Sequence, residues 1–205
     1  MSFYREHILP RLTDLAMRHP TLGAERVRWV PRAAGVVLEV GAGSGLNFAH
    51  YGSLVRRLYA LDPSAELRGM AATRAQRVRV PIEFLAAPAE AIPLPDASVD
   101  AVVTTWTLCT IAEPVRALLE MRRVLRCDGR LIFVEHGRSP DPRVRRWQDR
   151  LTPVWRRIAG GCHLNRPIDQ SIEAGGFEIS DIERGYVRGP RVGSYFYRGT
   201  ARVRG

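Results

Sequence analysis

Three glycines at alternate positions, Gly41, Gly43 and Gly45, follow directly after a short apolar run, and they constrain the fold of this chain more than any other feature. The run 35–40 predicts a buried strand. Glycines permit a tight turn and let a ligand approach the main chain closely, and amide groups at the start of a helix can hold an anionic group. The sequence therefore predicts a strand, a glycine-rich turn and then a helix, with a ligand site at the turn.

Apolar runs alternate with helix-like segments through the centre of the chain, which predicts an open α/β sheet with right-handed crossovers. Such runs suit parallel strands that are covered on both faces. The predicted strands are 35–40, 57–61, 82–86, 99–104 and 130–135. Helices are predicted at 65–76 and 113–125, the second of them stopped by Asp128-Gly129.

The tail of the chain changes character. Two strand-like runs, 177–183 and 194–199, are separated by the turn signal Gly189-Pro190. We therefore expect a Rossmann-like, mostly parallel sheet with helices on both faces and a C-terminal antiparallel hairpin. The expected organisation is a single domain over 1–205, with 1–30 as a helical cap and 141–168 as an arginine-rich insertion on the substrate side.

Two basic amphipathic segments, 3–18 and 143–158, flank the predicted core, and Pro10 and Pro153 are expected to break or kink them. All 31 basic residues are arginine, and the formal net charge is +10. The segment 143–158 supports three interpretations: a solvated face with an apolar seam, a surface that docks on anionic membrane, and a nucleic-acid site. Nucleic acid is disfavoured because no helix-turn-helix or aromatic RNA-binding motif accompanies the charge.

Asp62 ends the second predicted strand, about twenty residues beyond the glycine loop, where an acid can accept both hydroxyls of a ribose. A dinucleotide fingerprint requires Gly-x-Gly-x-x-Gly. Counted from Gly41, the last position of that pattern is Leu46, so the pattern fails. The spacing is instead Gly-x-Gly-x-Gly, preceded by Glu39, which favours S-adenosylmethionine (SAM) over a dinucleotide.

This arrangement resembles the class I SAM-dependent methyltransferases. Four stretches carry the resemblance, which covers nearly the whole chain: 39–47, 61–64, 89–100 and 122–131. The resemblance implies a seven-stranded sheet that ends in an antiparallel hairpin. Three further stretches are similar to one branch of the superfamily: 105–110, 134–138 and 160–166. That branch contains methyltransferase-like thiol methyltransferases and bacterial relatives labelled phosphatidylethanolamine or quinone methyltransferases.

The resemblance also implies a SAM site. Its residues would be Glu39, Gly41, Ala42, Gly43, Gly45, Asn47, Asp62, Pro63, Ala89, Glu90 and Thr105. The glycine loop and Glu39 would surround the methionine part of SAM, Asp62 would take the ribose, and Pro63 would lie against the adenine. Thr105 would lie near the methyl group. Pro88 departs from the pattern, because relatives often keep a polar residue there for the adenine amine.

The methyl group of SAM is already activated, so the enzyme must align the acceptor, exclude water and handle the proton of the acceptor. An amine or hydroxyl acceptor needs a base, whereas a thiol of pKa ~8.5 is already a few per cent thiolate at neutral pH. His163 and His136 are the candidate bases, and Thr105 completes the predicted catalytic set. Cys109 and Cys162 are expected to be packed thiols, and no metal site is predicted.

We therefore expect a SAM-dependent methyltransferase that acts on a small or lipophilic acceptor, with a thiol or a phospholipid amine favoured. The alternatives are a quinone-type C-methyltransferase and a basic nucleic-acid-binding protein on a methyltransferase fold. The three widely spaced cysteines form no disulfide framework and fit a reducing cytoplasm. A peripheral contact with anionic lipid at the inner membrane face is a further expectation.

Overall fold

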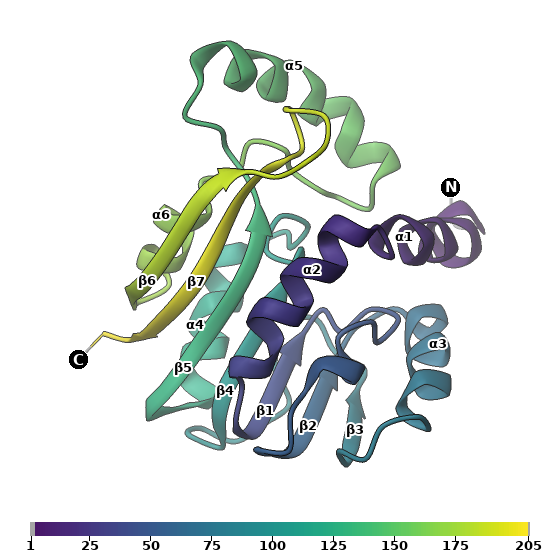
Figure 1. Ribbon diagram of the computed structural model, residues 1–205, viewed down its shortest axis with the longest axis vertical. Coiled ribbons are helices and arrows are strands. Elements are labelled where there is room, and N and C mark those ends of the chain that lie inside the picture. Colours follow the sequence, from purple (N-terminus) through teal and green to yellow (C-terminus); the bar gives the residue numbers. More distant parts are fainter. Residues whose placement is uncertain (1–2, 205) are drawn as a thin grey trace.

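The computed structural model describes residues 3–204, in which seven strands form one mixed sheet (Figure 1). The strands are β1 (Gly35–Val40), β2 (Val55–Leu61), β3 (Ile82–Leu85), β4 (Val99–Thr105), β5 (Leu125–His136), β6 (Phe177–Tyr186) and β7 (Tyr195–Val203). Their spatial order is β3-β2-β1-β4-β5-β7-β6. Strands β1 to β5 pair in parallel, and β7 runs antiparallel to both β5 and β6. The predicted fold class and its C-terminal hairpin are confirmed.

Helices cover both faces of this sheet. They are α1 (Leu9–Met17), α2 (Pro20–Trp29), α3 (Ala65–Ala75), α4 (Pro114–Val124), α5 (Pro142–Ile158) and α6 (Ile168–Ala174). Successive residues of a strand point to opposite faces, so Val37 and Leu38 of β1 belong to different apolar clusters. Val37 shares its cluster with Trp29 of α2 and Ala71 of α3, whereas Leu38 shares its cluster with Leu118 of α4.

The prediction of a helix directly after the glycine loop is wrong. Only a single 3-10 turn, Phe48–His50, follows the loop. The backbone of Tyr51 is extended, and the Tyr51 hydroxyl donates to the carboxylate of Glu39 at 2.8 Å. This buried anchor holds the segment in a turn, and Trp29 of α2 packs in the apolar cluster on the same face as Phe48.

Two further helix boundaries differ from the prediction. Pro153 does not interrupt α5. A proline leaves the carbonyl four residues earlier without its helical partner, but Asp149 and Pro153 are both exposed, so water can satisfy that carbonyl. The helix predicted over 113–125 ends at Val124, because Leu125 already pairs with Val99 of β4.

Both predicted amphipathic segments lie over the edge of the sheet where the parallel strands end (Figure 1). A π-helical turn, Tyr4–Ile8, runs directly into α1, so the type of helix changes just before Pro10 while the backbone stays helical. The hydroxyl of Tyr4 donates to the carbonyl of Ile158 at 2.8 Å and joins this turn to the end of α5. Within residues 3–204, no helix combines the length and the apolar character needed to cross a bilayer.

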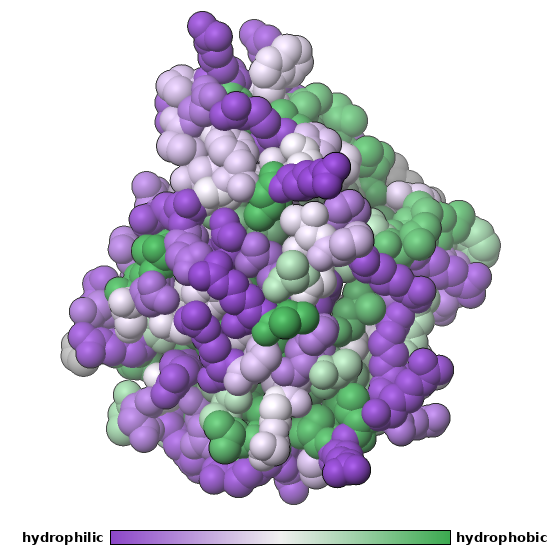
Figure 2. Space-filling view, viewed as in Figure 1, coloured by the Kyte–Doolittle hydropathy of each residue, from purple (hydrophilic) through white to green (hydrophobic). Residues whose placement is uncertain are grey.

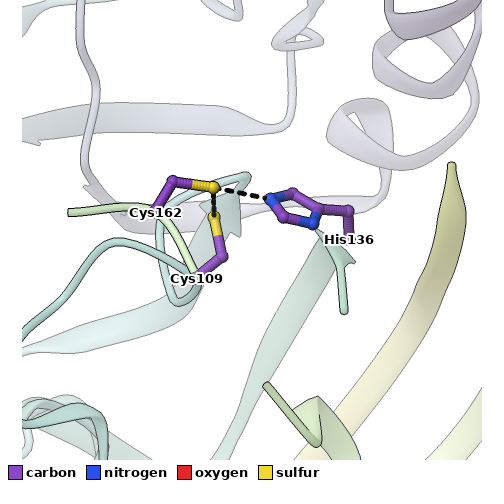
Figure 3. A group of neighbouring side chains, drawn as sticks. All are labelled: Cys109, His136 and Cys162. Atoms are coloured by element: carbon purple, nitrogen blue, oxygen red, sulfur yellow. Dashed lines mark hydrogen bonds between the residues drawn. The ribbon is translucent and has the colours of Figure 1, made fainter. Parts of the chain in front are cut away.

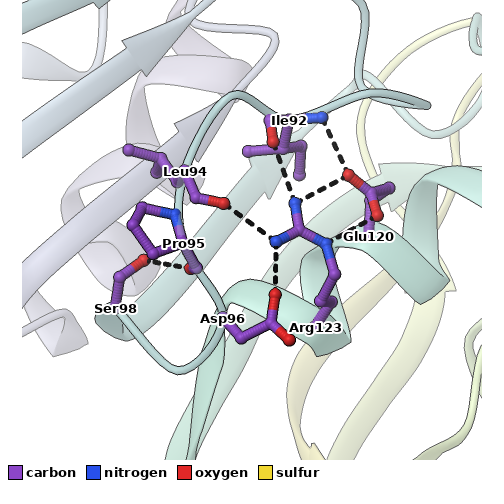
Figure 4. A network of polar contacts seen from close by, with 7 residues as sticks. All are labelled: Ile92, Leu94, Pro95, Asp96, Ser98, Glu120 and Arg123. Carbon is purple, nitrogen blue, oxygen red and sulfur yellow. Dashed lines mark hydrogen bonds and ion pairs between the residues drawn. The ribbon is translucent and has the colours of Figure 1, made fainter.

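Arg123 of α4 fixes the loop that leads into β4 (Figure 4). Its guanidinium donates to the carbonyls of Ile92 at 2.9 Å and Leu94 at 2.8 Å. It also contacts the carboxylates of Asp96 at 2.7 Å and Glu120 at 2.8 Å. These contacts satisfy loop carbonyls that lack a partner in a helix or strand. The loop directly follows one wall of the cavity described below.

Candidate active site

A cavity of about 450 Å³ opens where β1, β2 and β4 end. Its volume lies in the range of small-molecule sites, and the crevice outside the carboxyl ends of the strands is where open α/β sheets bind ligands. The predicted SAM residues that line it are Glu39, Gly41, Ala42, Gly43, Asn47, Asp62, Pro63, Ala89, Glu90 and Thr105. The structure therefore brings all but one of the predicted residues to a single cavity.

The exception is Gly45, which does not line the cavity. Its φ is +78°, and an added Cβ would lie 2.5 Å from the ring of Phe48. The absence of a side chain at Gly45 therefore serves the packing of the turn. Gly41, with a φ of +70°, is equally constrained, because an added Cβ would lie 2.2 Å from Oγ1 of Thr107.

Asp62 lies between the glycine loop and the turn after β2. One carboxylate oxygen accepts the N–H of Gly43 at 2.9 Å, and the other accepts the N–H of Ser64 at 2.8 Å. Burial raises the pKa of Asp62. A carboxylate offers about four acceptor positions, so the side chain holds the loop in place and still has about two positions left for a diol.

Glu39 forms the floor of the cavity. Its carboxylate accepts hydrogen bonds from Tyr51 and from Nδ2 of Asn47, each at 2.8 Å. The same Nδ2 lies 3.0 Å from the hydroxyl of Thr105. Complete burial raises the pKa of Glu39 to about 7. A cationic group in the cavity would favour the ionised form of this acid.

Two residues that the sequence did not single out complete the walls. Arg26 of α2 donates to Asn47 at 3.0 Å and lies over the ring of Trp106, 4.7 Å from its centroid. Burial lowers the pKa of Arg26 to about 10. Asp14 of α1 accepts from Ser44 at 2.5 Å and from Arg74 at 2.9 Å, which fastens α1 over the glycine loop. Neither residue gave a signal in the sequence, because Asp14 lies off the stripe of Leu12 and Leu15 and Arg26 belongs to no motif.

The two candidate bases lie outside the cavity lining. His163 Nδ1 lies 3.2 Å from the carbonyl of Cys109 and 3.1 Å from a guanidinium nitrogen of Arg166. Nε2 of His136 lies 3.1 Å from Sγ of Cys162. Hydrogen bonds from Cys109 and His136 lower the pKa of Cys162. A catalytic role for either histidine stays a prediction, and their placement argues against direct contact with an acceptor.

Comparison with known proteins identifies the family. Residues 38–133 match the family model described as a methyltransferase domain. The chain is 34% identical over 165 residues to thiol S-methyltransferase TMT1B of Homo sapiens, and the alignment covers 78% of this chain and 67% of that protein. The chain belongs to the class I SAM-dependent methyltransferases.

Two other relatives extend this result. The methyltransferase is 32% identical over 184 residues to demethylmenaquinone methyltransferase of Thermus thermophilus, with 82% of each chain covered. It shares its fold with 1,6-didemethyltoxoflavin-N1-methyltransferase of Burkholderia thailandensis, solved with its substrate and S-adenosylhomocysteine (SAH). That likeness has a TM-score of 0.69 at 20% identity and covers 94% of this chain and 82% of the other. The chain spans 62–67% of the length of the thiol S-methyltransferases that it matches.

SAM is the methyl donor of this family, and the cavity of this methyltransferase fits it. The two remaining acceptor positions on Asp62 match the two hydroxyls of a ribose. Arg26 would hold the carboxylate of the methionine part, and Glu39 would hold its ammonium group. Ala87 and Ala89 line the cavity and would give the adenine a wall of small apolar side chains.

Proposed function

We propose that this methyltransferase transfers the methyl group to a small or lipophilic thiol. The observation that carries the proposal is the cavity lining, to which no histidine contributes within residues 3–204. One part of the lining is formed by α1, by the loop that follows β4 and by the residues that follow α5. It includes Leu9, Pro10, Trp106 and Ala159. A thiol needs no enzyme base to ionise, because a few per cent of it is already thiolate in water at neutral pH and can enter such a region in that form. The name of the relative TMT1B supports the same acceptor.

Each carboxylate of the lining already has another role, because each accepts a hydrogen bond from the protein, and Glu39 and Asp62 would also hold the donor. The acceptors are Asp14, Glu39, Asp62 and Glu90. A phospholipid amine, or the ring carbon of a quinone-type acceptor, must lose a proton during methylation and would use a positioned base. These two acceptors are therefore the alternatives to a thiol. The names of the relatives called demethylmenaquinone methyltransferase support the second alternative.

When bound, SAM supplies a methyl group that is already activated on a sulfonium. The residues of this chain would supply alignment, which can account for much of the rate enhancement. Asp62, Glu39 and Arg26 would fix the two ends of the donor. Asp14 holds α1 over the glycine loop, where α1 would cover part of the donor.

Methyl transfer to an alkyl thiol is expected to rise about tenfold per pH unit up to the acceptor pKa of ~8.5 and then level off. The reason is that, with SAM at a saturating concentration, the ammonium group of the donor would keep Glu39 ionised, so the acceptor is the group that titrates over this range. A more acidic aryl thiol should therefore level off at a correspondingly lower pH. Initial rates with labelled SAM and each thiol, measured over about pH 6 to 9.5, test this expectation.

His163→Ala is the matched variant for the same assay and should keep its rate within about threefold, because a working general base contributes roughly 10²–10⁴-fold. The proposal fails if this variant loses a hundredfold or more and the pH break stays fixed when the thiol changes. Phosphatidylethanolamine and a reduced demethylated quinone belong in the same assay, and a faster rate with either would replace the thiol as acceptor.

We also propose that α1 and α5 dock on an anionic membrane surface. Apolar side chains stay exposed on both helices, among them Leu15 at 67% and Trp147 at 56%. Figure 2 shows hydrophobic side chains gathered beside hydrophilic ones over the region of α1. Arginines surround the apolar stripe of α5 at Arg143, Arg145, Arg146, Arg150, Arg156 and Arg157. An apolar face bordered by arginines is complementary to anionic headgroups, and the ends of both helices reach the cavity.

Co-sedimentation with phosphatidylcholine vesicles that contain phosphatidylglycerol tests this docking. We expect binding at low salt that weakens as salt rises. Trp147→Asp should lower the affinity by about tenfold or more, because it replaces apolar burial with a like-charged side chain. Leu54→Asp is the matched control, since Leu54 is 71% exposed but precedes β2 at the opposite edge of the sheet. No pelleting with anionic vesicles at low salt would exclude the docking.

A further inference from the structure

Three side chains from separate segments converge beside the cavity (Figure 3). Cys109 follows β4, His136 ends β5 and Cys162 follows α5, and their candidate ligand atoms all lie within 4.8 Å of one another. Nε2 of His136 lies 3.1 Å from Sγ of Cys162. The two sulfurs are 3.9 Å apart, and both cysteines are buried.

Two of the three separations are close to the edges of a metal coordination shell, and the third, between His136 and Cys109, is within 4.8 Å and would close to about 3.6 Å on binding. A tetrahedral zinc ion with Zn–S bonds of about 2.3 Å holds two sulfurs ~3.8 Å apart, and the two sulfurs here are 3.9 Å apart. The nitrogen–sulfur distance of 3.1 Å would need to widen to about 3.6 Å, which a small side-chain rotation provides. A disulfide would instead require the sulfurs at about 2.05 Å.

Neither the core nor the SAM site accounts for this cluster. Thiols are weak hydrogen-bonding groups, so packing alone does not require two of them to face an imidazole. The remaining nitrogen of His136, Nδ1, is buried without a hydrogen-bond partner among the described residues. The backbone N–H of His163 donates to the carbonyl of Cys109 at 2.8 Å, so the two cysteine-bearing segments are already fastened together.

We propose that Cys109, His136 and Cys162 bind a soft divalent cation of the zinc class, as two thiolates and one imidazole. Binding forms two metal–sulfur bonds and one metal–nitrogen bond and releases the two thiol protons to solvent. Three protein ligands leave a fourth position for water or a small exogenous ligand. The ion would connect the segment that carries Thr110 to the loop that carries Gly160, and both residues line the cavity.

Zinc content and zinc affinity test the site directly, with no need for methyl transfer. Protein from zinc-supplemented medium should carry about one zinc per chain. In competition with a chromophoric chelator, Cys109→Ser and Cys162→Ser should bind zinc at least about tenfold more weakly. Cys127→Ser is the matched control and should match the wild type, because Cys127 is exposed and outside the cluster.

Two measurements on the wild-type chain keep the test independent of how the variants fold. Cobalt(II) added to the metal-free protein should give thiolate-to-metal charge-transfer bands. Zinc should protect Cys109 and Cys162, but not Cys127, from alkylation until a chelator is added. Three outcomes would each overturn the proposal. Cobalt(II) added to the metal-free protein could give no charge-transfer bands, the isolated protein could contain a disulfide between Cys109 and Cys162 and no zinc, or folded Cys162→Ser could retain zinc.

Discussion

Asp62→Ala is expected to weaken SAH binding by about a hundredfold or more. The Asp62 carboxylate accepts the N–H groups of Gly43 and Ser64 and has about two acceptor positions left for the ribose hydroxyls. A hydrogen bond to a charged group contributes about 1.5–3 kcal/mol, so the loss of two corresponds to roughly a 10²–10⁴-fold rise in the dissociation constant. Calorimetric titration with SAH measures this change without any knowledge of the acceptor.

Ser64→Ala separates the loss of ligand contacts from the loss of the turn. The hydroxyl of Ser64 accepts the N–H of Leu67 at 3.3 Å and caps α3. Its removal should cost about 1 kcal/mol of folding free energy. Ser64 also lines the cavity, but we expect its loss to lower the affinity for SAH far less than Asp62→Ala does. If folded Asp62→Ala still binds SAH within threefold of the wild type, Asp62 does not hold the ribose. If Ser64→Ala loses affinity as strongly, the turn itself accounts for the effect.

Much of the fold could be predicted because it depends on local patterns. The apolar run at 35–40 is buried on both faces of the sheet, and the predicted strand matches β1 residue for residue. The missed features depend on distant partners. The turn at Phe48–His50 is held by the contact between Tyr51 and Glu39, and the continuity of α5 through Pro153 depends on exposure to solvent. Neither condition is visible in the residues of the segment itself.

At the site, too, residues of local motifs could be predicted and residues that depend on distant partners could not. Glu39, Gly41 and Asp62 belong to motifs with fixed spacing, so the sequence could assign them before the cavity was known. Arg26 reaches the cavity only because α2 crosses the sheet, and no spacing predicts that. The grouping of Cys109 and Cys162 depends on a loop contact between residues 53 positions apart. For this reason the sequence alone favoured packed thiols and gave no metal site.

Gly41→Ala is expected to destabilise the protein by about 2–5 kcal/mol. A left-handed backbone costs a residue with a side chain about 1–2 kcal/mol. The added Cβ would also lie 2.2 Å from Oγ1 and 2.3 Å from Cγ2 of Thr107, and overpacking costs about 1–3 kcal/mol. Thr107 cannot move freely, because its N–H donates to the buried carboxylate of Glu135 at 2.9 Å. Thermal unfolding should show a fall in the melting temperature of roughly 5–15 °C.

Gly43→Ala is the matched variant, because it shares the left-handed backbone with a φ of +55° but not the collision. The added Cβ would meet nothing nearer than the carbonyl oxygen of Gly41 at 3.9 Å. Gly43 lines the cavity, so we expect the added methyl group to occupy space there. We expect a stability loss of only about 1–2 kcal/mol together with at least about a tenfold loss of SAH affinity.

Gly52→Ala, with open space around the added Cβ, should change neither quantity. Equal melting temperatures for Gly41→Ala and Gly43→Ala would show that Thr107 does not limit the space at Gly41. Unchanged SAH affinity in Gly43→Ala would show that the donor does not contact the glycine loop.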